Sequence, residues 1–272
     1  DYLRRQKNLS MYPYYERILG KTSGQQAQIL LTLSEYRLKN EKDIKSYFQL
    51  LKGLDGYFDS LIEYSKEQVK RNLFLSDQSL KEVLQQIQNV IKQKENNMLV
   101  ATFNLRIADI KGINAAQKKK YCRENKKLIG TKVLPAYEKL YSHLQALNGN
   151  GKNENGLYYY KNGKEYYKVL VAQKTGSDKT IEEMIEISDR SIEKCLRKLI
   201  KLQKKYPNII NEYRNHKKNI KIVQNPQNIL NKLRQKMVKY YPKAPKVSCK
   251  IKYVHKTMEE YTSPAFYMVP EI

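Results

Sequence analysis

Long apolar stripes at three- and four-residue steps constrain this chain more than any other feature of its sequence. Residues 43–70 carry apolar side chains from Ile44 to Val69 at this spacing, which places them on one face of an α-helix. Residues 24–38 and 76–91 repeat the pattern. Because a helix with one apolar face must bury that face against another element, these segments predict a packed helical fold.

The composition supports this prediction. Only 11 Gly and 8 Pro interrupt the 272 residues, and the abundant Lys, Glu, Leu, Gln and Ile favour helices over a sandwich or barrel. We therefore predict an all-α fold built mostly of long helices. Two exceptions are expected. Apolar and polar residues alternate near 247–254, which predicts a minor β element, and tyrosines before Asn162-Gly163 predict a small hairpin or an extended piece near 157–163.

The positions of Gly, Asn and Pro suggest how the chain is organised. Residues 1–147 are expected to form a helical region, and 148–163 a loop or hairpin. Residues 164–272 should form a second helical region that ends in a short strand and an extended apolar tail. We expect these parts to make one continuous, truncated domain. Pro135 should kink or divide the long helix that the pattern predicts around it.

The segment Thr175-Gly176-Ser177-Asp178-Lys179-Thr180 superficially resembles a phosphate-binding loop. It lacks the Gly-Lys-Ser/Thr ending and a preceding strand, both of which such a loop requires. A helix end followed by a new helix start explains it better, because Thr180 and Glu183 have the spacing of a capping box.

The formal net charge of +25 favours anionic partners. However, only 11 of the 52 basic residues are Arg, whereas surfaces that read sequence or clamp phosphate depend on the bidentate guanidinium. Lysines are dispersed along helices beside Asn, Ile and Tyr. A biased composition, tuned to an anionic cell surface, therefore explains the charge better than dedicated nucleic-acid binding.

No residue pattern in the sequence indicates a catalytic centre. The three histidines, His143, His216 and His255, lack the one-turn spacing of a hydrolytic zinc site. The lysines before Cys122 could lower its pKa, but a solvated helix face explains them more simply. A Cys–His nucleophilic pair stays open, because such partners meet in space rather than in sequence. No stretch approaches the apolar length of a membrane span.

Five blocks, in this order along most of the chain, resemble a bacterial family catalogued as domain of unknown function 885. They are YFDSLIEY at 57–64, VLPAYEKL at 133–140, GKEYYKVL at 163–170, TGSDKTIEE at 175–183 and SPAFYMVP at 263–270. The resemblance implies a mostly helical, zincin-like protein, similar to gluzincin metallopeptidases that carry a His-Glu-x-x-Pro-Gly-His type zinc motif. It also implies export, often as a lipoprotein.

In that family the zinc motif lies downstream of the segment that resembles 263–270, and this chain ends at Ile272. The resemblance therefore implies that the chain is the amino-terminal part only. On this interpretation the chain has no cofactor, no metal ligand and no activity of its own. Zinc belongs to the full-length parent, and the main partner is the missing carboxy-terminal catalytic half.

The resulting hypothesis is that the chain forms one wall of the substrate cleft of an exported metallopeptidase, either a cell-envelope lipoprotein or a secreted protein. A helical wall would position a peptide substrate rather than supply chemistry. The candidate cleft residues are Tyr166, Tyr167, Tyr261 and Tyr267, and core packing is an alternative for each. The competing hypothesis is a non-enzymatic basic module that binds an anionic polymer, either a cell-wall polyanion or nucleic acid.

Overall fold

The computed structural model describes residues 1–21, 23–151, 154–219, 225–242, 251 and 253. Every regular element within these residues is helical, which confirms the all-α prediction. The α-helices and three short turns of other helix types are, in chain order, α1 (Tyr2–Ser10), α2 (Gln25–Glu35), α3 (Glu41–Lys70), α4 (Asp77–Lys92), η1 (Lys94–Asn96), α5 (Met98–Ala108), α6 (Ala115–Leu128), η2 (Ile129–Val133), α7 (Leu134–Gln145), η3 (Leu157–Tyr159), α8 (Gly163–Thr175), α9 (Ile181–Lys205), α10 (Ile209–Asn219) and α11 (Pro226–Met237).

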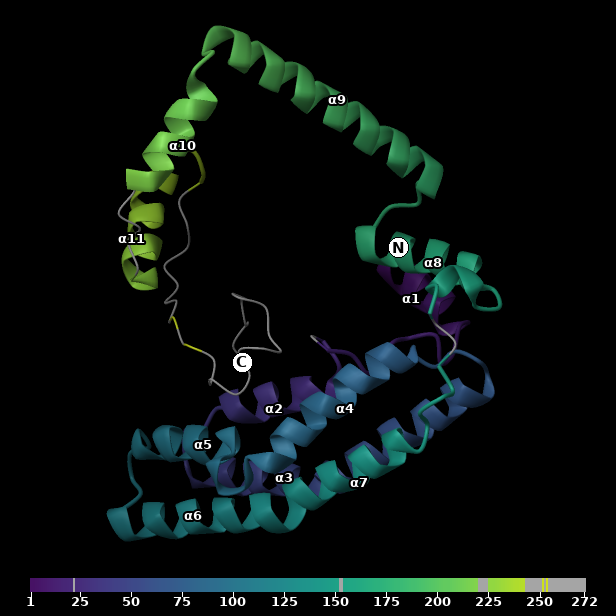
Figure 1. Cartoon of the computed structure of the whole chain (residues 1–272). Coiled ribbons are helices and arrows are strands. Elements are labelled where there is room, and N and C mark those ends of the chain that lie inside the picture. Colours follow the sequence, from purple (N-terminus) through teal and green to yellow (C-terminus); the bar gives the residue numbers. More distant parts are fainter. Residues whose placement is uncertain (22, 152–153, 220–224, 243–250, 252, 254–272) are drawn as a thin grey trace. The chain divides into compact units, whose positions relative to one another are not determined.

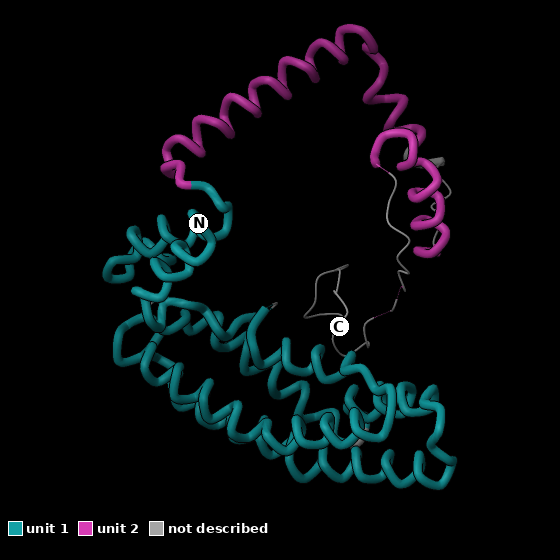
Figure 2. Tube along the Cα trace, turned by 180° about the vertical axis from the view of Figure 1, so that it is seen from behind, with its two compact units in different colours: residues 1–177, 255–272 teal, residues 178–254 magenta. Residues whose placement is uncertain are grey.

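The chain divides into two compact units between residues 177 and 178. Helices α1 to α8 belong to the first unit and α9 to α11 to the second, as the two colours of Figure 2 show. The tyrosines at the start of α8 lie in the first unit, so its packing decides how they are held.

Helix α3 supplies the longest apolar face of the first unit. Its residues Ile44, Leu51 and Phe58 have no exposed surface. Helix α7 packs against both α3 and α4 (Figure 1). The ring of Tyr137 in α7 meets that of Phe58 edge to face, with centroids 4.7 Å apart. The long stripe seen in the sequence is therefore the core of this unit.

Side-chain caps fix where several helices begin. Asn40 and Asp43 form a capping box at the start of α3, and the Ser76 hydroxyl accepts a hydrogen bond from the backbone of Ser79 at the start of α4. The capping box predicted before α9 is also present, because the Thr180 hydroxyl accepts from the Glu183 amide and the Glu183 carboxylate accepts from the Thr180 amide.

Pro135 divides the long helix as expected, and the structure shows how. Helix α6 passes through a π-helical turn, η2, directly before α7, and Pro135 occupies the first turn of α7. Proline has no amide hydrogen and its ring clashes with the carbonyl four residues earlier. A widened turn at this point accommodates proline while the helical path continues.

The hairpin predicted near 157–163 is wrong. Leu157–Tyr159 forms a single 3-10 turn, and the chain then folds directly into α8. Asn162 takes a left-handed conformation with φ 56°, and Gly163 lies so close to Leu157 that a Cβ there would be 1.7 Å from the Leu157 carbonyl oxygen. Asn-Gly therefore makes a tight turn into a helix instead of joining two strands. The β element predicted near 247–254 falls almost wholly outside the described residues, and Ile251 and Tyr253 are not in a strand.

The loop that leads toward η3 is fastened to the start of α4. One carboxylate oxygen of Asp77 accepts hydrogen bonds from the backbone amides of Gly149 and Gly151, each at 3.0 Å. The backbone of residue 151 lies so close to the start of α4 that only glycine fits there, because a Cβ would lie 2.5 Å from the Asp77 amide nitrogen. The Asn- and Gly-rich segment is thus an ordered connection where it meets α4.

Replacing Phe58 by Ala should lower the free energy of unfolding by about 3–5 kcal/mol, because the change removes a fully buried ring and leaves a cavity beside Tyr137. Leu50→Ala is the control on the same helix, at a side chain that is 49% exposed. It should change the free energy by less than about 0.5 kcal/mol. Urea denaturation followed by circular dichroism measures both, and equal losses would contradict this account of α3.

Candidate functional site: the tyrosines of α8

Four tyrosines from two segments of the first unit meet beside the first turn of α8. We call Tyr12, Tyr15, Tyr160 and Tyr166 the tyrosine cluster. The Tyr166 ring lies 4.9 Å from that of Tyr15 and 5.6 Å from that of Tyr12, centroid to centroid. Tyr160 is 6.3 Å from Tyr15. Rings at these separations and tilts attract one another in addition to the apolar area they bury, so the cluster joins the chain after α1 to α8.

Hydrogen bonds connect this cluster to the helices beneath it. The Tyr160 hydroxyl lies 2.9 Å from the Leu73 carbonyl oxygen and 3.1 Å from that of Phe74, and it donates its proton to this pair. The Tyr15 hydroxyl donates to the carbonyl of Lys161. The turn before α8 is therefore held from both sides, by the connection between α3 and α4 and by the segment after α1.

The segment after α1 is itself held in an unusual backbone conformation. Tyr14 has φ 71°, a value that costs free energy in residues other than glycine. The Gln68 side-chain amide donates to the carbonyls of Tyr14 and Glu16, at 2.8 and 3.0 Å. The Arg71 guanidinium lies 4.7 Å from the centre of the Tyr14 ring. These contacts from the end of α3 offset the backbone cost and fix where Tyr15 points.

Burial changes the protonation chemistry of the cluster. It raises the pKa of Tyr160 to about 12. It also raises the pKa of Tyr15 and Tyr166, with the nearby carboxylates of Glu165 and Glu16 adding to the effect. These hydroxyls therefore stay protonated well above neutral pH, and those of Tyr15 and Tyr160 donate hydrogen bonds. They are suited to holding the fold together, not to taking protons from a substrate.

A second group of tyrosines from the same segment faces solvent. Tyr158, Tyr159 and Tyr167 are 62%, 66% and 46% exposed. The Lys164 ammonium lies 4.3 Å from the centre of the Tyr158 ring, and the Tyr158 and Tyr159 rings meet edge to face at 5.1 Å. Lys164 and Tyr167 are three residues apart on α8 and share one side of it. We call Tyr158, Tyr159, Lys164 and Tyr167 the aromatic patch.

The structure separates the two neighbouring candidates from the sequence. Tyr166 is 5% exposed and belongs to the tyrosine cluster. It therefore packs in the core, which was the alternative to a cleft position. Tyr167 lies on another side of α8 and is accessible. Tyr261 and Tyr267 fall outside the described residues. Tyr158 and Tyr159 were not among the candidate cleft residues. The run of three tyrosines was their only sequence signal, and which ring faces solvent depends on the 3-10 turn.

The described residues contain no metal site. Among them, no group of three or more His, Cys, Asp or Glu side chains is arranged to hold a metal ion. These side chains therefore do not fit a zinc ion. Burial raises the pKa of the Cys122 thiol, so the neighbouring lysines do not make it an activated nucleophile.

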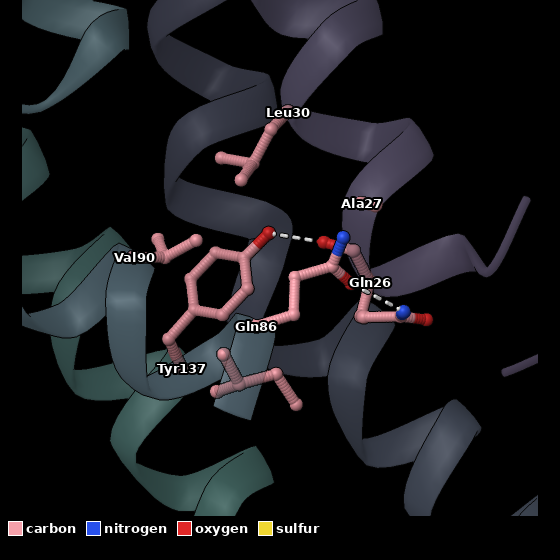
Figure 3. A pocket seen from close by; sticks show the side chains of 7 residues that line it. Gln26, Ala27, Leu30, Gln86, Val90 and Tyr137 are labelled. Atoms are coloured by element: carbon pink, nitrogen blue, oxygen red, sulfur yellow. Dashed lines mark hydrogen bonds between the residues drawn. The ribbon is translucent and has the colours of Figure 1, made fainter. Parts of the chain in front are cut away.

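A small gap in the core of the first unit is also not a ligand site. It lies among side chains of α2, α4 and α7, where the Tyr137 hydroxyl donates to the Gln26 carbonyl at 2.7 Å (Figure 3). The Gln26 side-chain amide donates to the Gln86 side-chain oxygen at 2.7 Å. The gap leaves no room for a water molecule. These hydrogen bonds satisfy polar groups inside the helical packing.

The model of one protein family, described as "Bacterial protein of unknown function (DUF885)", matches residues 2–272. The chain belongs to this family. No curated protein matches it in sequence. A solved structure described as "the putative lipoprotein from Colwellia psychrerythraea" is similar, with a TM-score of 0.60 and 18% sequence identity. That similarity covers 65% of this chain and 31% of the other, so the chain spans only part of its structural neighbour, and the likeness shows the fold alone.

Replacing Tyr160 by Phe should lower the free energy of unfolding by about 1–2 kcal/mol at pH 8, because two buried carbonyls lose their donor. The pH dependence should change as well. The pKa of Tyr160 is raised from 10.0 to about 12, so the stability it contributes is complete below pH 10 and is lost as pH rises toward 12.

Urea titrations of wild type and Y160F at pH 8, and at steps from pH 10 to 12, measure both effects. The variant should lose less stability than wild type over the alkaline steps. Y159F, at an exposed tyrosine next to it, is the matched control and should behave as wild type. A Y160F protein as stable as wild type at pH 8 would contradict the anchoring role of Tyr160.

Proposed function

We propose that this chain is the amino-terminal helical part of an exported, zincin-like metallopeptidase, and that its aromatic patch forms part of the wall of the substrate cleft. The observation that carries the proposal is the contrast within one short segment: buried tyrosines fix η3 and α8, while Tyr158, Tyr159 and Tyr167 stay exposed. An exposed aromatic group on a rigid support binds a ligand without losing much conformational entropy.

The chemistry of the patch suits a peptide. Tyrosine rings offer flat apolar faces and hydroxyl groups, which can pack on side chains and hydrogen-bond to backbone carbonyls. Lys164 adds one positive charge at the edge of these rings and can attract a carboxylate. The patch can therefore orient a peptide, and the zinc ion and general base would come from the rest of the parent protein.

The proposed location is the cell envelope. Membership of a bacterial family and the fold shared with a protein described as a "putative lipoprotein" support it. Among the described residues, no helix combines the length and the apolar character needed to cross a bilayer. On this proposal the chain acts outside the cytoplasm, where peptides of the envelope or the surroundings are its substrates.

The full-length parent, carrying Y158A and Y167A together, tests the proposed cleft wall. Removing the two rings should lower kcat/KM for peptide hydrolysis by about tenfold or more, because each buried aromatic contact contributes on the order of 1 kcal/mol. Y213A with Y240A is the matched control, since both of these tyrosines are exposed and lie in the second unit. The control pair should retain wild-type hydrolysis.

Zinc analysis of the same preparations tests the wider assignment. The full-length parent should bind zinc stoichiometrically and hydrolyse peptides, and this chain alone should do neither. A parent without zinc and without peptidase activity would contradict the metallopeptidase proposal. If the parent hydrolyses peptides and the Y158A/Y167A pair changes nothing, the cleft assignment of the patch is wrong.

A second candidate function is the binding of a cell-wall polyanion, and one surface favours it. Lys119, Lys120, Arg123 and Lys127 are exposed and lie on one side of α6; we call them the basic face of α6. Four cations spaced along a helix can contact successive phosphates of a polymer. The net charge of +25 would add long-range attraction.

Replacing all four residues of the basic face by Gln should weaken binding to a teichoic-acid-type polymer by about tenfold at low salt, because roughly 1 kcal/mol is lost in total at an exposed surface. The control R214Q/K232Q/K236Q/K239Q removes the same number of positive charges from exposed positions in α10, α11 and the segment after α11. It should bind as wild type. Titrations at two salt concentrations measure this, with duplex DNA as a comparison. Equal losses in both variants would show that charge alone, without a site, drives binding.

A further inference from the structure

Helix α9 carries an apolar seam along its length. From Ile181 to Tyr206 its positions follow alternating steps of four and three residues, and all but Ser188 are apolar. The seam comprises Ile181, Ile185, Ser188, Ile192, Cys195, Leu199, Leu202 and Tyr206. Steps of four and three keep a seam on one side of a helix over many turns, which is the pattern of two helices packed along their length.

This seam is accessible to a partner. Ile192, Leu199 and Leu202 are 56%, 59% and 49% exposed, and Cys195 is exposed as well. The capping box at Thr180 and Glu183 fixes the start of α9, so the helix does not need a partner to begin at this point. A pre-formed helix with one apolar side is stabilised when another helix covers that side.

Charge along α9 is divided between its two halves. Residues 181–193 contain five acidic residues and one basic residue, for a net charge of −4. Residues 194–205 contain six basic residues and no acidic residue, for a net charge of +6. A parallel copy would place the two positive halves side by side. An antiparallel copy places each negative half beside a positive half, which lowers the electrostatic energy.

We infer that α9 is a dimerisation helix, in which the seams of two copies of this chain pack antiparallel around a two-fold axis. The charge pattern fits a second copy of the chain. A two-fold axis perpendicular to α9 places the acidic half of each helix beside the basic half of the other. No ligand, metal or other protein is needed to complete the contact.

The seam spacing also fixes the register of the pair. An axis that crosses between residues 193 and 194 sets Ile192 against the partner's Cys195 and Ser188 against the partner's Leu199. Ile185 then meets the partner's Leu202. Ser188 and Cys195 each face a larger side chain, and Ile185 faces one of equal size, so the layers fill evenly.

Two substitutions on α9, one in the seam and one outside it, test whether the seam holds the dimer together. Wild-type protein should sediment as a dimer, and I192K should raise the dimer dissociation constant by roughly tenfold or more, because it places a charge in the centre of the seam. I187K is the matched control: it makes the same change at another exposed isoleucine of α9, which lies outside the seam. It should leave the dissociation constant nearly unchanged.

Both side chains are exposed in the single chain, so neither substitution should unfold it, and circular dichroism checks this. A wild-type protein that stays monomeric at high concentration would overturn the inference and leave the seam to another partner, such as the rest of the parent protein. Equal effects of I192K and I187K would also overturn it, because general charge repulsion would then explain both.

Disulfide formation tests the orientation. The chain's three cysteines are first replaced by Ala, and S188C and L199C are then introduced into separate samples. An antiparallel pair brings residue 188 beside the partner's residue 199, so the disulfide should form mainly when the two proteins are mixed. Disulfides formed efficiently within each sample alone would indicate a parallel pair and contradict the proposed packing.

Discussion

The hydrogen bonds of the Tyr160 hydroxyl to the Leu73 and Phe74 carbonyls are the contact on which the arrangement of the first unit depends. They join the turn before α8 to the connection between α3 and α4. The rings of Tyr15 and Tyr166 close over the same turn. Without the Tyr160 hydroxyl, these buried carbonyls would have no donor. Leaving them unpaired lowers the free energy of unfolding by more than the hydrogen bond contributes by itself. Together with the contacts from the segment after α1, this anchor sets the place of α8.

The same residue type serves two opposite purposes within this segment. Tyr160 and Tyr166 point inward and fasten the helix, and their raised pKa values keep them protonated. Tyr158 and Tyr167 are exposed and offer flat aromatic surfaces. With 23 Tyr, five Phe and no Trp, the chain relies mainly on tyrosine for both tasks. In this segment the hydroxyl suits both, because backbone carbonyls accept from it inside and water can do so outside.

Much of the fold could be predicted from the sequence, because apolar spacing and caps are local signals. The stripe of 43–70 became α3, and the Thr180–Glu183 box starts α9. The turn before α8 could not be predicted in this way. Asn-Gly suits both a hairpin and a tight turn, and the choice depended on contacts with residues far away in sequence. For the same reason, the inward or outward direction of the adjacent tyrosines was not readable from their pattern.

Hydrogen exchange measured residue by residue on the native chain tests the central claim most directly. If Tyr160 anchors α8 to the bundle, the amides of α8 should be protected together with the end of α3 and the start of α4, and all should open with one common free energy. Amides of α8 that exchange at the rate of an unstructured chain, while α3 stays protected, would contradict the account.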